Sequence, residues 1–455
     1  MTILQEAPQV KFNAGSSAPL EIYQSDKIAK SYVYALAQPD QRNIFTTISK
    51  SEHRPKRKLV GQLLSDQSMR AFEPTIRNQI TVFLTQLLES KGSSVNMAPN
   101  CRHLGLDIVG LLGFGYNLHL QTDAAQRYLT DAINFGNYRV NTCLQFPPLA
   151  KLKPGLIMDL FPNSLRAKLM ATIQMMITTR LAQPSDARHD LLSVFTEHSD
   201  VDTNNLRQGQ LWTEAVFFFA AGGETIASTL AATFFYLSQN PQCYQKLAAE
   251  IRSTFNTGSE IRGGPHLSGC RYLRACIDES LRMSPPVPGI LWREAAVPAT
   301  GDQQQREPLI IDGQVIPHGT QIGVSIYSLH HNEAYFPDPF RFQPERWLEG
   351  RETAKRLATH DALAAFSIGS RGCAGKAMAY LETSLVLAMT LWYFDFEMAQ
   401  DKSEKRRNGK ITGVRYDEDE PGREFPIYDL FVAAHDGPVL VFRPRGNLYE
   451  ELSQG

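Results

Sequence analysis

The chain has 455 residues, of which 43% are hydrophobic, so it can bury a large core and has room for one to three domains. A formal net charge of −1 gives no general attraction for nucleic acid, and nucleic-acid binding is therefore not favoured. The six cysteines stand in a long chain that starts without a secretory signal, which argues against a disulfide framework and for a reducing, cytosol-facing location.

The first fifty residues are expected to hold strand-like pieces at QVKFNAG and APLEIY and a short helical piece around SDKIAKSYVYAL. From residue 52 to about residue 91, apolar side chains recur at helical spacing. The same spacing continues in CRHLGLDIVGLLG, AQRYLTDAINF and LRAKLMATIQMMITTRLAQ. The N-terminal half is therefore predicted to be rich in helices.

Leu211 to Leu237 form an apolar stretch long enough to cross a bilayer. Glu214 and Glu224 lie inside it, and an acidic residue near the centre of a span costs roughly 2.5–3.5 kcal/mol. We therefore predict a buried core helix here. No other run has the required apolar length, so no membrane span is expected in this chain.

The C-terminal half begins with the helical patterns NPQCYQKLAAEIRSTF and YLRACIDESLRM, which a proline-rich break, SPPVPGILWR, follows. The segment LIIDGQVIPHGTQIGVSIYSLH alternates β-branched and polar residues around DG and HG turns, and the tail repeats this signal around another DG. Because there is no internal repeat or long linker, the sequence predicts one domain over residues 1–455, mainly α with small β-sheets.

One cysteine lies in a glycine-punctuated stretch, FSIGSRGCAGKAMAYLE. Gly369, Gly372 and Gly375 let the backbone turn sharply and approach a flat ligand. The helix that follows Cys373 is expected to lower the pKa of its thiol and to favour a thiolate. A lone thiolate suits a soft or borderline metal, and haem is the cofactor best known for a single cysteine ligand. The alternative is a helix-start loop with an incidental cysteine.

Arg371, two residues before the cysteine, can pair with an anionic cofactor edge such as a haem propionate, and Phe366 can pack on the sulfur side. The full pattern F-x-x-G-x-R-x-C-x-G, which includes Gly375, resembles the haem-binding signature of the cytochrome P450 superfamily. Members of that family bind haem b through the cysteine, so the resemblance implies Cys373 as the axial ligand of the haem iron.

Three further motifs follow the family's pattern. Glu279 and Arg282 in ESLR lie three residues apart, which places them on one face of a helix as an ion pair. Any surface helix can show such a pair, but Arg346 in PERW occupies the position of the family's arginine that completes a buried network behind the haem. The resemblance therefore implies a structural role for these three residues.

The second motif is AGGET in the long central stretch. Two glycines inside a helix cost roughly 1 kcal/mol each relative to alanine, which makes sense if the backbone opens there to hold water or dioxygen. By resemblance, Thr225 donates a hydrogen bond to the bound oxygen and Glu224 relays protons from solvent. The alternative is a core helix with a satisfied threonine.

The third motif is HRPKRK, where family members commonly have W-x-x-x-R. His53 stands in the aromatic position and Arg57 follows four residues later, on the same helical face. The resemblance implies that both contact the haem propionates. Arg293 occupies another position where the family often has a propionate partner. A basic run that is simply solvated is the alternative.

By resemblance, the chain is a monooxygenase of eukaryotic and probably fungal type that inserts one oxygen atom of O2 into a lipophilic small molecule, with a role in secondary metabolism. The sequence contains no flavin-binding unit, so electrons from NADPH are expected to arrive through a separate reductase, with Lys376 as a candidate docking residue. The substrate pocket is expected to be apolar and to include Phe218, Ala221, Val287, Ile290 and Leu291, together with the tail near residues 428–431.

The start of the chain departs from the family pattern, because an anchoring helix and the first strand are expected before it. The location is therefore either the cytoplasmic side of the endoplasmic reticulum or, without an anchor, the soluble cytoplasm. Two other functions stay open: a haem-thiolate isomerase or dehydratase that acts on a peroxide already in its substrate, and a catalytically silent haem-binding protein.

Overall fold

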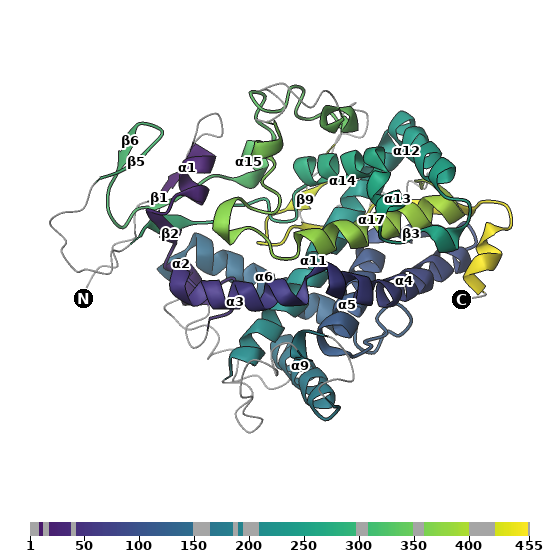
Figure 1. Ribbon diagram of the computed structural model, residues 1–455, viewed down its shortest axis with the longest axis horizontal. Coiled ribbons are helices and arrows are strands. Elements are labelled where there is room, and N and C mark those ends of the chain that lie inside the picture. Colours follow the sequence, from purple (N-terminus) through teal and green to yellow (C-terminus); the bar gives the residue numbers. More distant parts are fainter. Residues whose placement is uncertain are drawn as a thin grey trace.

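The computed structural model describes residues 9–11, 18–37, 42–148, 164–184, 190–193, 209–296, 308–348, 359–399 and 424–453. Helices dominate the described residues, and small sheets lie at one end and along one side (Figure 1). The helices are α1 (Ala18–Gln24), α2 (Val33–Ala37), α3 (Lys50–Leu63), α4 (Asp66–Glu89), α5 (Met97–Phe114), α6 (Tyr128–Gln145), α9 (Leu165–Leu181), α11 (Gln210–Gln239), α12 (Pro241–Thr254), α13 (Pro265–Gly269), α14 (Arg271–Met283), α15 (Ile326–His330) and α17 (Lys376–Tyr393).

Local sequence explains where several helices start and stop. Ser49 and Ser65 cap α3 and α4, and each accepts a hydrogen bond from a backbone N–H in the first turn. Asn96 caps α5 in the same way, and Gly115 ends that helix in the left-handed conformation, with φ 61°.

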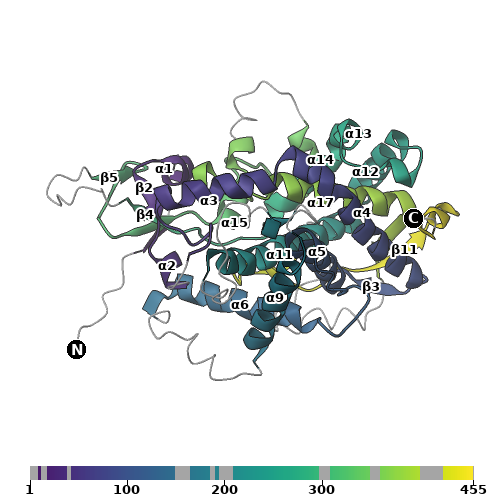
Figure 2. The ribbon, with the colours of Figure 1, turned by 60° about the horizontal axis from the view of Figure 1, so that its bottom comes forward.

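Helix α11 is the centre of the fold. It packs along its length against α5, and α14 and α17 also contact it (Figures 1 and 2). Helices α11 and α5 approach closely because each has glycine at the contact. A Cβ at Gly222 of α11 would lie 2.5 Å from Val109 of α5, and a Cβ at Gly223 would lie 2.5 Å from Leu106. A Cβ at Gly105 would lie 2.6 Å from the Gly223 carbonyl oxygen. Larger residues would force the helices apart.

This contact changes the interpretation of the AGGET stretch. The sequence suggested that the glycine pair opens the helix, but α11 is continuous from Gln210 to Gln239. The pair instead serves the contact with α5, where side chains of any size would collide. A glycine pair at this place is therefore accounted for by packing, whatever else it does.

The strands form small sheets. Within the described residues, β1 (Gln9–Lys11), β7 (Gln321–Gly323), β4 (Arg293–Ala295) and β2 (Ile28–Lys30) lie in that order in one sheet. β1 and β7 are parallel and the other pairs antiparallel. The remaining sheets pair β3 (Ser94–Asn96) with β11 (Val439–Pro444) and β8 (Phe394–Met398), β5 (Leu309–Ile311) with β6 (Gln314–Ile316), and β9 (Ile427–Tyr428) with β10 (Ala434–His435).

Most predicted elements are confirmed. The helical patterns of both halves form α3, α4, α5, α6, α9, α11, α12 and α14, and the DG hairpin forms β5 and β6 with Asp312 and Gly313 at φ 51° and 73° in the turn. The prediction at APLEIY is wrong, because this segment is helix α1. Alanine, leucine and glutamate favour a helix, and Ile22 is buried on one side of it. SDKIAKSYVYAL is also divided differently, into strand β2 and helix α2.

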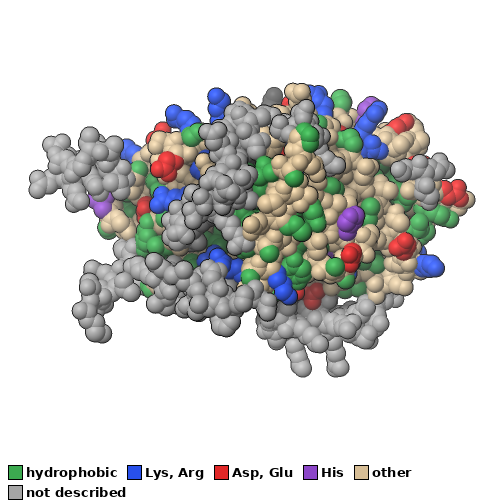
Figure 3. Space-filling model, turned by 90° about the horizontal axis from the view of Figure 1, so that it is seen from below, with side chains coloured by type: hydrophobic (Ala, Val, Ile, Leu, Met, Phe, Trp, Pro, Cys, Tyr) green, Lys and Arg blue, Asp and Glu red, His purple; other side chains and the backbone are tan. Residues whose placement is uncertain are grey.

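Helix α11 is the one described helix whose length and hydropathy would suffice for a membrane span. More than half of its apolar stretch is buried inside the protein, as expected of a core helix. The face in Figure 3 carries both acidic and basic side chains between apolar ones, in keeping with the net charge of −1.

Candidate functional site

The loop before α17 brings Cys373 against the start of α3. Gly369 has φ 74°, and a Cβ there would collide with the Tyr23 carbonyl group, so only glycine fits. The Cys373 N–H donates a hydrogen bond of 2.7 Å to the Phe366 carbonyl oxygen, which closes the loop. Arg57 on α3 donates to the Gly372 carbonyl oxygen at 2.7 Å. The residues that the family pattern connects are therefore neighbours in space.

The Cys373 side chain is exposed although protein surrounds it on most sides. Burial raises the pKa of its thiol, and the Gly375 N–H, Arg57 and Lys376 oppose this rise without cancelling it. The expectation that the helix start lowers this pKa is therefore wrong for the free thiol. A side chain that is both accessible and desolvated is expected at the wall of a recess, where a ligand can reach the sulfur.

Five cationic or titratable side chains converge beside this loop. They interact electrostatically with one another: His53 with Lys30, Arg57 and Arg371, and Arg293 with Lys30 and Arg371. We call them the cation cluster, and its members are Lys30, His53, Arg57, Arg293 and Arg371. None of the five has a carboxylate partner among the residues that the structure describes.

The charges of the cation cluster repel one another. Burial, followed by the Arg371 charge, lowers the pKa of His53 to about 4, and burial with the Arg293 charge lowers that of Arg371 to about 10. Arg371 donates to the Thr47 and Ile48 carbonyl oxygens at 2.7 Å each, and Arg293 donates to the Leu291 and Trp292 carbonyl oxygens. Carbonyl groups satisfy the donors but do not neutralise the charge.

This arrangement fits haem. An accessible cysteine sulfur can ligate the iron, and cations that have no carboxylate partner among the described residues match the two anionic propionates. Phe366 packs against the Tyr380 ring with 5.2 Å between ring centroids, which holds the loop over α17.

A second charged group lies deeper in the core. Glu279 accepts hydrogen bonds from Arg282 at 2.9 and 3.0 Å, from Arg346 at 3.0 Å, from the Gln343 N–H at 3.0 Å and from the Trp347 indole at 2.9 Å. Glu279 and Arg282 are fully buried. We call this group the glutamate network. The ion pairs that the two motifs predicted are present.

Glu224 and Thr225 lie midway along α11. The Glu224 Oε2 atom accepts a hydrogen bond of 3.0 Å from Arg102 on α5, whereas its Oε1 atom is buried without a partner in the described part of the chain. Burial raises the pKa of Glu224 more than Arg102 lowers it. The Thr225 hydroxyl donates to the Ala221 carbonyl oxygen at 2.8 Å, so in this structure its proton is directed into its own helix.

The predicted pocket residues come from two segments. Phe218 and Ala221 lie on α11, and Val287, Ile290 and Leu291 precede β4. All five are half-buried. Ile290 and Phe431 of the tail pack against the same small hydrophobic cluster, so the segment before β4 and the tail lie near each other. That these residues line a substrate pocket stays a prediction.

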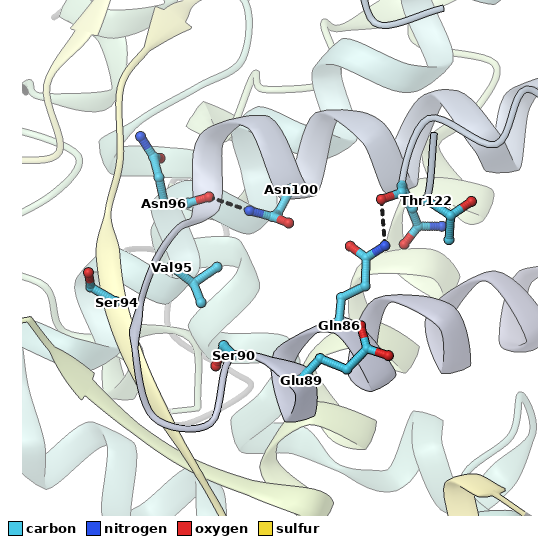
Figure 4. Close-up of a pocket in the computed structure, with 9 residues that line it drawn as sticks. Gln86, Glu89, Ser90, Ser94, Val95, Asn96, Asn100 and Thr122 are labelled. Carbon is cyan, nitrogen blue, oxygen red and sulfur yellow. Dashed lines mark hydrogen bonds between the residues drawn. The ribbon is translucent and has the colours of Figure 1, made fainter. Parts of the chain in front are cut away.

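A hollow of about 540 Å³ lies elsewhere, between α4, β3 and the start of α5 (Figure 4). Its walls are mostly amides and hydroxyls that bond to nearby backbone, such as Asn100 to the Asn96 carbonyl oxygen at 2.7 Å. Glu89 is its one acidic residue. It contains none of the predicted site residues, and a single carboxylate among amides and hydroxyls supplies no chemistry.

Sequence reasoning missed Lys30 and Arg102. Lys30 is a single lysine in the short strand IAK, and Arg102 is one of several polar residues on α5. Neither belongs to a motif, and the charged groups with which they interact, Arg293 for Lys30 and Glu224 for Arg102, lie more than 100 residues away in the chain. No sequence signal pointed to either of them.

Comparison with known proteins identifies what the chain resembles. A sequence profile of the cytochrome P450 family matches residues 20–417. A cytochrome P450 monooxygenase of Gibberella zeae is 34% identical over 449 residues, which cover 95% of this chain and 99% of that protein. The cytochrome P450 monooxygenase AKT7 of Alternaria alternata is 32% identical, covering 95% and 83%. The cytochrome P450 monooxygenase poxM of Penicillium oxalicum is 34% identical, covering 91% and 77%.

Proposed function

The chain belongs to the cytochrome P450 monooxygenase family, and from this premise we propose that it inserts one oxygen atom of O2 into a lipophilic small molecule. The second oxygen atom leaves as water. The two electrons come from NADPH through a separate reductase. The similar proteins come from fungi, which supports a fungal type of enzyme and a role in secondary metabolism.

One observation carries the proposal: an accessible cysteine sulfur stands beside buried and half-buried cations for which the described part of the chain supplies no carboxylate partner. Cys373 would ligate the haem iron, and Arg57, Arg293 and Arg371, with His53, would hold the propionates. Bound haem supplies the activation of dioxygen, and a thiolate ligand favours cleavage of the O–O bond. Phe366 and Gly375 would keep the loop in position around the sulfur.

Glu224 and Thr225 would deliver protons. A buried carboxyl with a raised pKa holds a proton more readily than a surface glutamate, and its unpaired Oε1 atom can pass that proton on. Arg102 holds the other oxygen and thereby orients the group. The Thr225 hydroxyl oxygen can accept a hydrogen bond while its proton is donated to the Ala221 carbonyl oxygen. A rotation about χ1 would direct that proton away from the helix.

Apolar residues would select the substrate. Phe218, Ala221, Val287, Ile290 and Leu291 offer apolar surface, and the ring of Phe217 beside them stacks on Phe45. A lipophilic molecule fits such a surface better than a polar one. Lys376, exposed at the start of α17, would contribute to the docking of the reductase.

The pair Glu224 and Thr225 favours oxygen activation over the two other functions. An isomerase or dehydratase that acts on a peroxide in its substrate needs no protons from solvent to cleave dioxygen, and a silent protein needs no relay. Turnover with NADPH and a reductase, in the absence of a peroxide substrate, separates the oxygenase from both.

The test of the ligand is the ferrous–CO difference spectrum. Wild-type protein is expected to give the band of a thiolate-ligated haem, and Cys373→Ala is expected to abolish it because Cys373 is the one exposed cysteine of the described structure. Cys243→Ala, which changes a half-buried cysteine on α12, is the matched control and should keep the band. A Cys373→Ala protein with an unchanged band would contradict the proposal.

A further inference from the structure

Lys30 is a buried lysine that the proposed chemistry does not yet use. It ends strand β2, and only 5% of its surface is exposed. Its ammonium group donates to the Phe45 carbonyl oxygen and lies over two aromatic rings, 4.1 Å from the centroid of Tyr34 and 3.7 Å from that of Phe45. An ammonium group has three donors, so two remain for another partner.

The register of the sheet makes this position unusual. β2 and β4 are antiparallel, and Lys30 stands directly opposite Arg293. Like charges at opposed positions of an antiparallel pair destabilise the sheet, and both residues are buried. Arg371 adds a third positive charge nearby, and no carboxylate of the described residues interacts with Lys30. Aromatic faces stabilise a cation only in part.

Lys30 also lies where two parts of the site meet. Arg293 and Arg371 of the cation cluster interact with it electrostatically. The Phe45 ring beneath its ammonium group stacks on Phe217 of α11 at 5.6 Å and contacts Phe431 of the tail at 5.4 Å. Phe45 and Phe431 pack against the same hydrophobic cluster as Ile290, one of the predicted pocket residues. An anion bound by Lys30 would therefore touch both the cofactor region and the pocket.

We propose that Lys30, together with Arg293 opposite it, forms a buried carboxylate-binding site at the junction of the cofactor region and the substrate pocket. This inference rests on the proposed haem enzyme. A carboxylate supplies the negative charge that the strand pair lacks and accepts the free N–H groups of Lys30. It can come from a haem propionate or from a carboxylic acid group of the substrate.

The first arm of the test measures haem loss from the holoenzyme to an excess of a haem-binding acceptor protein. If a propionate is the partner, Lys30→Met should release haem at least tenfold faster than wild type, and Lys30→Arg should stay close to wild type because it keeps the charge. Lys58→Met, which removes an exposed lysine from α3, is the matched control and should change nothing.

The second arm uses dodecanoic acid and its methyl ester as probes in spectral titrations of the holoenzyme. If a substrate carboxylate is the partner, wild type should bind the acid at least tenfold more tightly than the ester. Lys30→Met should lose this preference while its rate of haem loss stays unchanged. Lys30→Arg should keep the preference.

The proposal is overturned if Lys30→Met leaves both the haem-loss rate and the acid-to-ester preference unchanged. Where Lys30→Met yields no folded holoenzyme, Lys30→Gln replaces it, and equal behaviour of Lys30→Gln and Lys30→Arg in both arms overturns the proposal. The ferrous–CO spectrum of each sample separates the two hypotheses: a wild type without the thiolate band contradicts the proposed function and does not bear on Lys30.

Discussion

The glutamate network and the cation cluster both place charges in buried or half-buried positions, but they compensate these charges differently. The network contains its own anion, Glu279, which five donors surround. The cation cluster contains none among the described residues, and burial together with the neighbouring positive charges lowers the pKa values of Lys30, His53 and Arg371. A buried charge requires a partner, so the first group is complete as folded and the second is complete only with a bound anion.

The source of the compensating negative charge distinguishes structural residues from ligand-binding ones in these two groups. Both groups contain arginines that a motif predicted, and the motifs alone do not say which arginine serves stability and which serves a cofactor. The location of the compensating negative charge does say so. Substitutions in the network should change the stability of the fold, and those in the cation cluster should change the retention of the bound group.

The largest effect on stability is expected from Glu279→Gln. This change removes the one carboxylate of the network and leaves Arg282 and Arg346 buried without a counter-charge, which should lower the free energy of unfolding by about 3–5 kcal/mol. Denaturant unfolding of the purified protein measures it.

The matched control is Glu345→Gln, because Glu345 lies next to Arg346 but forms a surface ion pair with Lys246. This change should cost less than about 1 kcal/mol. Equal losses for the two variants would contradict the view that Glu279 is the partner on which the network depends.

The next effect concerns turnover. The Glu224 pair with Arg102 is an intermediate case, since one carboxylate oxygen has a partner and the other has none. Glu224→Gln keeps the shape but removes the transferable proton, so turnover with NADPH and a reductase should fall about a hundredfold, with little change in haem content. The control is Glu214→Gln. Glu214 is another buried acid of α11, but it pairs with Lys56 and lies outside the relay, so this variant should retain the turnover per haem. Wild-type turnover of Glu224→Gln would remove Glu224 from the relay.

A third prediction uses pH to detect the missing anion. The pKa of His53 is about 4 in the folded chain and 6.5 ordinarily, so below pH 6.5 the unfolded chain takes up a proton that the folded chain refuses. The contribution of His53 to stability should therefore fall by about 2 kcal/mol as the pH drops from 6.5 to about 4, after allowance for solvent near the ring.

A bound propionate would raise this pKa, so haem-loaded protein should lose less stability over the same range. The measurement is the unfolding midpoint of haem-free and loaded protein across that pH range. His53→Phe should remove the difference between the two, whereas His266→Phe, at an exposed histidine, should not. A pH response that is the same with and without haem would contradict an anion beside His53.

Much of this molecule could be predicted from the sequence, and the failures have physical reasons. The glutamate network was predictable because Glu279 and Arg282 are neighbours on one helix and a motif supplied Arg346. Lys30 and Arg102 were not, because their roles arise from pairing with Arg293 and Glu224, which are distant in the chain. APLEIY was assigned to a strand because six residues are too few to distinguish the 3.6-residue period of a helix from the two-residue period of a strand.

The smallest predicted effect comes from a third way to bury a charge. Glu382 lies buried on α17 without a partner among the described side chains, and burial raises its pKa to about 8. The folded chain therefore keeps a proton that the unfolded chain releases above its ordinary pKa of 4.5, so the contribution of Glu382 to stability should decrease as the pH rises from 4.5 to about 8 and then level off. Glu382→Gln cannot ionise and should be more stable than wild type at the upper end of this range, by about 1–2 kcal/mol, because local opening of the helix lets water relieve part of the cost. Below pH 4.5 the two proteins should have equal stability.

Thermal unfolding of wild type and Glu382→Gln across this pH range measures the difference in stability. Glu397→Gln, at an exposed glutamate on β8, is the control that should show no such difference from wild type. A wild type that loses no stability relative to Glu382→Gln over this range would mean that Glu382 finds a counter-charge when the chain is folded, which would place it with the glutamate network and not apart from it.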